Sequence, residues 1–407
     1  MVIVAAALLA GYLVPELDRA ASDDLPYVFP GGPSGARDML GTIAGAMISV
    51  TGLVFSITMV VVQLASSQYS PRVLGDFLAS RVTQLTLGVF AASFTYALTV
   101  LRSVRGESGD GGSFVPQLAV TLAFLLVLAS VGMFLAFIHH ITNSIQVSSI
   151  VSQLGNATVD VVDRYFPVPA TGDARPRQDD GEPHEGMLAQ CIQAREHGAV
   201  VELDHHRLVE RATEHDVIIE VLLQVGAFAA EGQPALRIWR HATAAPLGEA
   251  HLDALRSLVV VEQDRILNQD PAFGVRKLVD IAERALSPAV NDPTTAVQVL
   301  DEVHRILRTT VTRQDLPALV SSAGSLRLIH RPQRVEQLVD LALAEPLHYG
   351  EGSLQVPRRV EVMLVDLRDV ALPEHRPPID RWLARARAII ARQGEHEGRA
   401  SGPRTAS

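Results

Sequence analysis

The stretch Gly41–Ala65, GTIAGAMISVTGLVFSITMVVVQLA, decides the fold of this chain. It lies in a run from Met39 to Pro71 that contains no Asp, Glu, Lys or Arg. About 20 consecutive apolar residues are what an α-helix needs to cross a bilayer. A helix also satisfies its own backbone hydrogen bonds where no water is present. The stretch therefore predicts a membrane-spanning helix, and the lipid bilayer is the first expected partner of the protein.

One face of this helix carries small residues at spacings of three and four. They are Gly41, Gly45, Ser49, Gly52 and Ser56. Small side chains let a second helix approach closely inside lipid, so this pattern predicts a helix-packing face and a homo-oligomer. The alternative is that the hydroxyl groups of this face line a narrow pore in the assembled oligomer.

Two further segments, Val82–Leu101 and Val115–Ile141, are long and free of charged residues, and each predicts a membrane-spanning helix. The apolar segment Met1–Val14 is shorter. We expect it to be a first helix that is either short or has its true start upstream of Met1. The predicted membrane part is therefore α-helical, with three clear transmembrane helices and one short one.

Loop charges predict the orientation of these helices. The loop Pro15–Leu40 has an excess of acidic residues, whereas the loop after Ala65 carries Arg72 and Arg81 against Asp76. Loops rich in Arg and Lys remain in the cytoplasm. The Arg102–Ser113 loop is then outside, and the chain beyond Ile141 is cytoplasmic.

Apolar residues recur every three or four positions from Ile141 to Phe166, which predicts one long helix that leaves the bilayer as an amphipathic stalk. Its apolar face must pack against a stalk of another subunit or against the soluble domain. Leu252–Ile266 is also apolar at helical spacing. The expected segments are a transmembrane domain (1–145), a stalk (146–166), a linker (167–186), a small α+β subdomain (187–245), a helical cytoplasmic domain (246–393) and a disordered tail (394–407).

The composition of the chain excludes two classes of protein. A net charge of −10 over 407 residues argues against a nucleic-acid partner. One cysteine, Cys191, provides no disulfide framework.

Two stretches together resemble a known family. They are SSQYSPRVLGDF at 66–77 and QDPAFGVRKLVDIAERALSPAVNDPTTA at 269–296. They resemble a bacterial family of predicted integral membrane proteins of unknown function, with an N-terminal four-helix membrane part and a C-terminal soluble domain. The resemblance implies a multi-pass protein of the bacterial inner membrane and implies no activity.

A dense set of polar residues around the second stretch is the candidate site. Its members are Asp264, Arg265, Gln269, Asp270, Arg276, Asp280, Arg284, Asn291 and Asp292. These residues either line a ligand site between two helices or form a network of salt bridges and helix caps. We favour the second interpretation, with Asp292 as the N-cap of a helix that begins at Pro293.

Other constellations carry less weight. No catalytic motif is visible, so we expect no enzyme. Asp204, His205, His206 and Glu210 are more simply an exposed helix start than a metal site, where three or four ligands converge. Residues 225–239 resemble the turn of biotinyl and lipoyl carriers. The only lysine, Lys277, lies far from that turn, so we expect no cofactor.

The predicted function has two versions. The first is a channel-like or solute-permeating homo-oligomer that the cytoplasmic domain regulates. The second is a non-transporting scaffold or signalling protein whose soluble domain binds a ligand or a partner that the sequence does not identify. The predicted spans contain no Asp, Glu, Lys or Arg, which counts against a proton-driven pump.

Overall fold

The computed structural model describes residues 1–20, 29–68, 81–106, 114–144, 146–169 and 186–400. It forms two compact units, Met1–Ser149 and Ile150–Ser407, which are described separately below. Arg72 and most of the first family stretch (residues 69–77) lie outside the described residues, as does most of the predicted linker.

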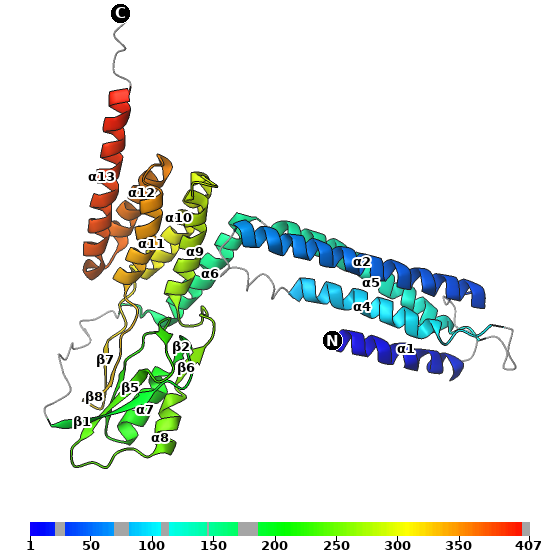
Figure 1. The fold of residues 1–407 in the computed structure, drawn as a ribbon, viewed down its shortest axis with the longest axis horizontal. Helices are drawn as coiled ribbons and strands as arrows, with labels where there is room; N and C mark the ends of the chain where they lie inside the picture. The colour runs from blue at the N-terminus through cyan, green and yellow to red at the C-terminus, as the bar shows by residue number, and fades with distance from the viewer. Residues whose placement is uncertain (21–28, 69–80, 107–113, 145, 170–185, 401–407) are drawn as a thin grey trace, which may run out of the picture. The chain divides into compact units, whose positions relative to one another are not determined.

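Four helices make up the described part of the first unit (Figure 1). They are α1 (Val2–Ala20), α2 (Pro33–Gln68), α4 (Arg81–Leu101) and α5 (Gln117–Ser144). Three segments of them, Pro33–Gln63, Arg81–Leu101 and Gln117–Thr142, are long and apolar enough to cross a membrane. The predicted helical membrane part is confirmed.

Both helices that flank the first loop are longer than predicted. The loop was expected over Pro15–Leu40, but α1 continues through Pro15 to Ala20, and α2 already begins at Pro33. Proline is well tolerated in the first turn of a helix, which explains the early start of α2. In α1 the acidic residue Asp18 accepts a hydrogen bond from the backbone N–H of Ala119 (3.1 Å) and so caps the first turn of α5.

Helix α4 is the centre of the first unit, since it contacts α1, α2 and α5. Gly11 on α1 permits one of these contacts, because a Cβ atom there would lie 2.8 Å from Cβ of Thr99. Between α4 and α5, the buried hydroxyl groups of Ser93 and Ser130 form a hydrogen bond (3.0 Å). Close approach through small residues and hydroxyl pairs is typical of helices in lipid.

The long stalk helix was predicted to be unbroken, and this is wrong. Helix α5 ends at Ser144, and α6 runs from Val147 to Tyr165. The break falls at residues 145 and 146, of which the structure describes only Gln146, and it lies outside both helices. The apolar face of α6 is buried within the second unit, where Thr158 lies against Gly274 and Gly155 lies against Glu302.

The second unit contains two β-sheets (Figure 1). The five-stranded sheet has the order β1 (Met187–Gln193), β5 (Pro234–His241), β3 (Ile218–Val221), β8 (Ser325–Ile329), β7 (Leu319–Ser322). The three-stranded sheet has the order β4 (Phe228–Ala229), β2 (Gly198–Leu203), β6 (Val259–Glu262). All pairs are antiparallel except β3 and β8. Helices α7 (His205–Glu214) and α8 (Glu249–Arg256) pack beside them.

Two of these elements differ from the sequence prediction. The predicted helix Leu252–Ile266 is wrong beyond Arg256, because Val259–Glu262 forms strand β6. The three consecutive valines of this segment are β-branched and favour a strand. The predicted cap of α7 is confirmed, since the Asp204 carboxylate accepts from the Arg207 backbone N–H (3.0 Å).

The remaining elements form a helical layer (Figure 1). They are α9 (Pro271–Leu286), α10 (Pro293–Thr310), α11 (Val335–Tyr349), α12 (Gln355–Val370), the short 3₁₀ helix η1 (Pro373–His375) and α13 (Arg376–Ala400). Helix α13 extends to Ala400, so the predicted disordered tail over 394–407 is wrong for its first seven residues. A soluble domain of helices and sheets, mainly helical, is confirmed.

The contact between α6 and α9 yields a stability prediction. A Cβ atom on Gly274 would lie 2.0 Å from Oγ1 of Thr158, so we expect Gly274→Ala to destabilise the second unit by about 1–3 kcal/mol. Both tryptophans, Trp239 and Trp382, lie in this unit, so tryptophan fluorescence during thermal unfolding reports it in the full chain.

The matched control is Gly352→Ala, where a Cβ atom meets nothing within 4 Å. We expect this control to unfold at the wild-type temperature. Equal unfolding temperatures for wild type and Gly274→Ala would show that α6 does not approach α9 this closely.

Candidate functional site

The structure separates the predicted polar cluster into three places. Arg265, Gln269 and Asp270 lie in the loop before α9, Arg276 and Asp280 lie on α9 facing α11, and Asn291 and Asp292 lie in the turn between α9 and α10. Asp264 and Arg284 are exposed. The residues therefore do not form a single ligand site.

The first place is organised around the carboxylate of Asp270, which is fully buried. It accepts hydrogen bonds from Nε and Nη2 of Arg265 (2.5 and 3.0 Å) and from the backbone N–H of Phe273 (3.0 Å), so it caps α9 as well. The side-chain amide of Gln333 donates to it (2.7 Å) and to the carbonyl of Val225 (3.1 Å). This arrangement joins a sheet loop, α9 and the segment before α11.

Gly226 makes room for this carboxylate. Its φ of +83° favours glycine, and a Cβ atom there would lie 2.4 Å from Oδ2 of Asp270. Next to Asp270, Gln269 holds the chain end of β2 by accepting from the backbone N–H of Leu203 (3.0 Å). The hydrogen bonds of Asp270, Gln269 and Gln333 are thus directed at the protein itself, as expected for a structural network.

A small cavity of about 30 Å³ lies beside this network. Its lining includes His205 and His330, whose rings are 4.6 Å apart. Burial, together with the neighbouring His205, lowers the pKa of His330 to about 4, and burial also lowers the pKa of His205. Both rings are therefore neutral near pH 7. A space of this size suits a single water molecule and is too small for a metabolite.

The second place is a group of carboxylates between α9 and α11. Arg276 forms ion pairs with Glu345 and, at 3.9 Å, with Asp280. Burial and the hydrogen bond to Glu345 raise the pKa of Glu283 to about 7. Lys277, on the same helix, is buried with its Nζ atom 4.8 Å from the centre of the Phe273 ring. This place is charged, and it changes protonation near neutral pH.

The third place is a turn with capping geometry. Asp292 accepts from the backbone N–H of Thr295 (3.1 Å) and from its hydroxyl group (2.6 Å), and these bonds lower the pKa of Asp292. Asn291 has a φ of +49° and donates its backbone N–H to Ser287 (2.8 Å). Asparagine tolerates this left-handed conformation. The geometry is that of the N-cap expected from the sequence.

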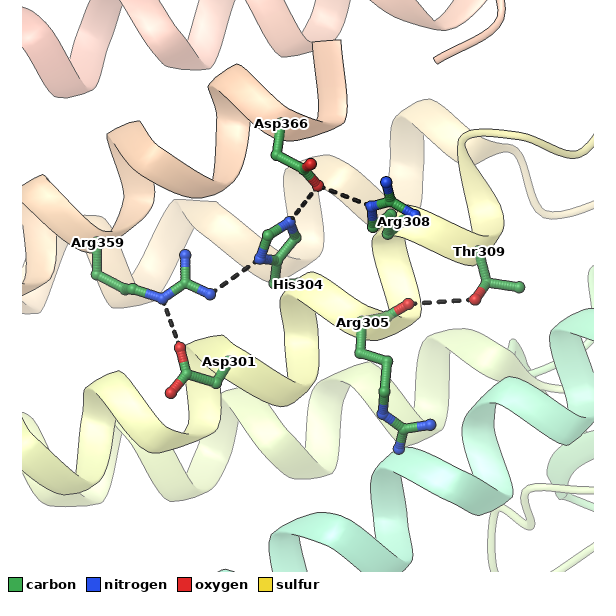
Figure 2. A network of polar contacts seen from close by, with 7 residues as sticks. All are labelled: Asp301, His304, Arg305, Arg308, Thr309, Arg359 and Asp366. Atoms are coloured by element: carbon green, nitrogen blue, oxygen red, sulfur yellow. Dashed lines mark hydrogen bonds and ion pairs between the residues drawn. The ribbon is translucent and has the colours of Figure 1, made fainter. Parts of the chain in front are cut away.

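The sequence reasoning missed a polar network between α10 and α12, which Figure 2 shows. Nη2 of Arg359 donates to Nδ1 of His304 (2.9 Å), which leaves Nε2 of His304 to donate to Asp366 (2.7 Å). Arg359 also binds Asp301 (2.5 Å), and Arg308 also binds Asp366 (2.9 Å). The spacing of Asp301, His304 and Arg308 on one helix face was the available signal, but their partners lie more than 50 positions away.

None of the residues that the structure describes covers the small-residue face of α2. All five residues, Gly41, Gly45, Ser49, Gly52 and Ser56, are exposed. A Cβ atom built on any of the three glycines meets nothing within 4 Å. The hydroxyl groups of Ser49 and Ser56 bond to carbonyls of their own helix (2.9 Å each).

Comparison with known proteins gives a consistent result. A family model described as "Predicted membrane protein (DUF2254)" matches residues 1–366. The uncharacterized proteins Mb1321c of Mycobacterium bovis and Rv1290c of Mycobacterium tuberculosis are each 35% identical over 296 residues. The match covers 72% of this chain and 56% of each relative, so the chain spans little more than half their length. No solved structure matches.

The Asp270 network predicts a large loss of stability on mutation. The change Asp270→Ala leaves Arg265 and Gln333 without their acceptor, so we expect it to destabilise the second unit by about 3 kcal/mol. This value is the lower end for a broken buried ion pair, because Arg265 is partly exposed. The measurement is thermal unfolding of the full chain by tryptophan fluorescence. Asp264→Ala, at an exposed neighbouring position, is the control and should change stability by no more than about 0.5 kcal/mol. A stable Asp270→Ala protein would favour a ligand site instead.

The raised pKa of Glu283 predicts a pH dependence. Because its folded pKa of about 7 is above its ordinary value of 4.5, the stability from this group is complete below pH 4.5 and is lost as pH rises to about 7. Gln does not titrate. We therefore expect the difference in unfolding temperature between Glu283→Gln and wild type to shift in favour of Glu283→Gln as the pH rises from 4.5 to about 7. A temperature difference that stays constant with pH would contradict the assignment.

Proposed function

The chain belongs to the DUF2254 family of predicted membrane proteins, and from this premise we propose that it is a channel-like, solute-permeating homo-oligomer. In this proposal the protein is a multi-pass protein of the bacterial inner membrane with no enzymatic activity. Its soluble domain lies in the cytoplasm and regulates the membrane part.

The observation that carries the proposal is the uncovered small-residue face of α2. Other exposed positions of this helix carry large apolar side chains such as Ile48, Phe55 and Met59, which suit contact with lipid. The face of Gly45 and Ser49 instead offers backbone and hydroxyl groups. Lipid chains make few van der Waals contacts with such a face, whereas another helix can pack closely against it. A second copy of the chain is therefore the partner that we propose for it.

The connection between α5 and α6 supports regulation by the soluble domain. Helix α5 ends at Ser144 and α6 begins at Val147, so two residues join a membrane span to a helix of the second unit. Helix α6 is fixed there by its buried face and by the ion pair of Asp163 with Arg313 (2.5 Å). A displacement of α6 is transmitted along this short connection to the end of α5.

A specific observation also favours the second candidate, a non-transporting scaffold or signalling protein. The hydroxyl groups of Ser49 and Ser56 already have acceptors within α2. They do not need water or a permeating solute as partners, so the same face serves equally well for packing alone. The two functions differ in flux but share the oligomer.

The orientation is tested by cysteine labelling from outside intact cells, in a Cys191→Ser background. We expect a cysteine at Ser108 to react with an impermeant maleimide and one at Ser401 to react only after lysis, because the net basic loop after Ala65 stays in the cytoplasm and the next loop is then outside. The opposite pattern would reverse the orientation.

Permeation is tested with the purified full chain in liposomes. We expect wild type to release a mixture of small ions and solutes, and Gly45→Leu to lose both the oligomer and the release, because a large side chain separates the helices. Val60→Leu, at an exposed position of the same helix, is the control and should keep both. If the oligomer depends on Gly45 but the liposomes release no solute, the scaffold function is favoured over the channel.

A further inference from the structure

The two sheets of the second unit line a largely apolar cavity of about 200 Å³ that is partly open to solvent. Its walls come from β1 and β5 of the larger sheet and from β6 of the smaller one. Ile192, Ala235 and Leu236 line one side, and Val259 and Val261 line the other. β1 and β6 are edge strands of their sheets, and they do not pair with each other. The cavity is lined by both of these edge strands.

The size and the lining of this cavity suit a small aliphatic group. An apolar space of about 150 Å³ is large enough for a molecule the size of benzene. The aliphatic part of a ligand that lies against such a lining gains free energy by leaving water. Six of the nine lining residues are aliphatic, and most of these six are buried.

The rim of the cavity carries two arginines and is partly exposed. Arg195 and Arg256 line it, and both donate to the same carboxylate, that of Asp253 (2.7 Å from Arg195). Arg256 also donates from Nε to the carbonyl of Gln193 (3.0 Å), which fixes its guanidinium at the rim. A guanidinium group has several N–H donors, and these bonds use one nitrogen of Arg195 and two of Arg256. The remaining N–H groups can donate to a carboxylate brought by a ligand, with which guanidinium pairs in good geometry.

We propose that this cavity is a binding site for a small aliphatic carboxylate, whose tail fills the space between the sheets and whose carboxylate meets Arg256 and Arg195. The exposed Glu196 also lines the rim. The carboxylate of Glu196 would distinguish two kinds of ligand. It would repel a simple aliphatic carboxylate but would bind the ammonium group of an aliphatic amino acid. The site goes beyond the proposed permeation and does not depend on it.

Binding is measured by isothermal titration of the full chain in lipid nanodiscs, with empty nanodiscs as the blank. The probes share one branched tail: 4-methylpentanoate, L-leucine and 4-methylpentylamine. We expect the acid or the amino acid to bind and the amine not to bind. Preference for leucine that is lost in Glu196→Gln identifies an amino acid, and preference for 4-methylpentanoate identifies a simple acid.

Two kinds of variant assign the binding to this cavity. Ala235→Leu fills the space from β5, and Val261→Phe fills it from β6, so at least one of them should fold and abolish binding. Arg256→Gln should weaken binding by about tenfold or more, since it removes a charge-assisted hydrogen bond. Arg207→Gln, at an exposed arginine on α7, is the matched control and should bind as wild type does.

Three results would overturn the assignment. They are no heat of binding from either carboxylate, equal binding of the amine, and unchanged binding in a folded Ala235→Leu or Val261→Phe protein. Flux through the membrane part plays no role in any of these measurements.

Discussion

The buried carboxylate of Asp270 is the interaction on which the second unit depends. Asp270 lies at the end of the segment between strand β6 and helix α9, and its carboxylate caps the first turn of α9. The same carboxylate accepts a hydrogen bond from Gln333, which precedes α11. Because Gln333 also donates to Val225, this single group links the sheets to the helical layer. A buried charge is tolerated only when it is paired and hydrogen-bonded, and Asp270 is both. The arginine, the amide and the left-handed glycine around it are therefore parts of one arrangement.

The first unit obeys a different constraint. Water is absent from the bilayer core, so hydroxyl groups there bond within the helices, as Thr51 and Thr58 do with carbonyls one turn earlier. Large apolar residues then face outward, and small residues mark the faces where a neighbour approaches. Gly11 has such a neighbour within the chain, in Thr99, whereas Gly45 has none among the described residues. This contrast is the basis for proposing a second copy of the chain.

Features that depend on neighbouring residues could be predicted from the sequence. The charge-free run around Gly52 predicts a span, and Asp204 and Asp292 predict helix caps, since a cap acts on a backbone N–H three residues away. Features that depend on distant residues could not be predicted. The pairing of Val259–Glu262 with β2 and the close approach of α6 to Gly274 are two such features. The residues of the predicted polar site lie in three separate places because their partners, among them Gln333 and Glu345, are far away in the sequence.

The burial of Lys277 gives this protein an internal reporter. It is the only lysine in the sequence, and it lies beneath the ring of Phe273 on the helix that Asp270 caps. Amine-reactive reagents modify only accessible, unprotonated amines, so the intact second unit shields its one side-chain target. The rate of lysine acylation, followed by mass spectrometry in native membranes, then measures how often α9 opens. Such a readout follows local opening of the soluble domain without purification and without any signal from the membrane helices.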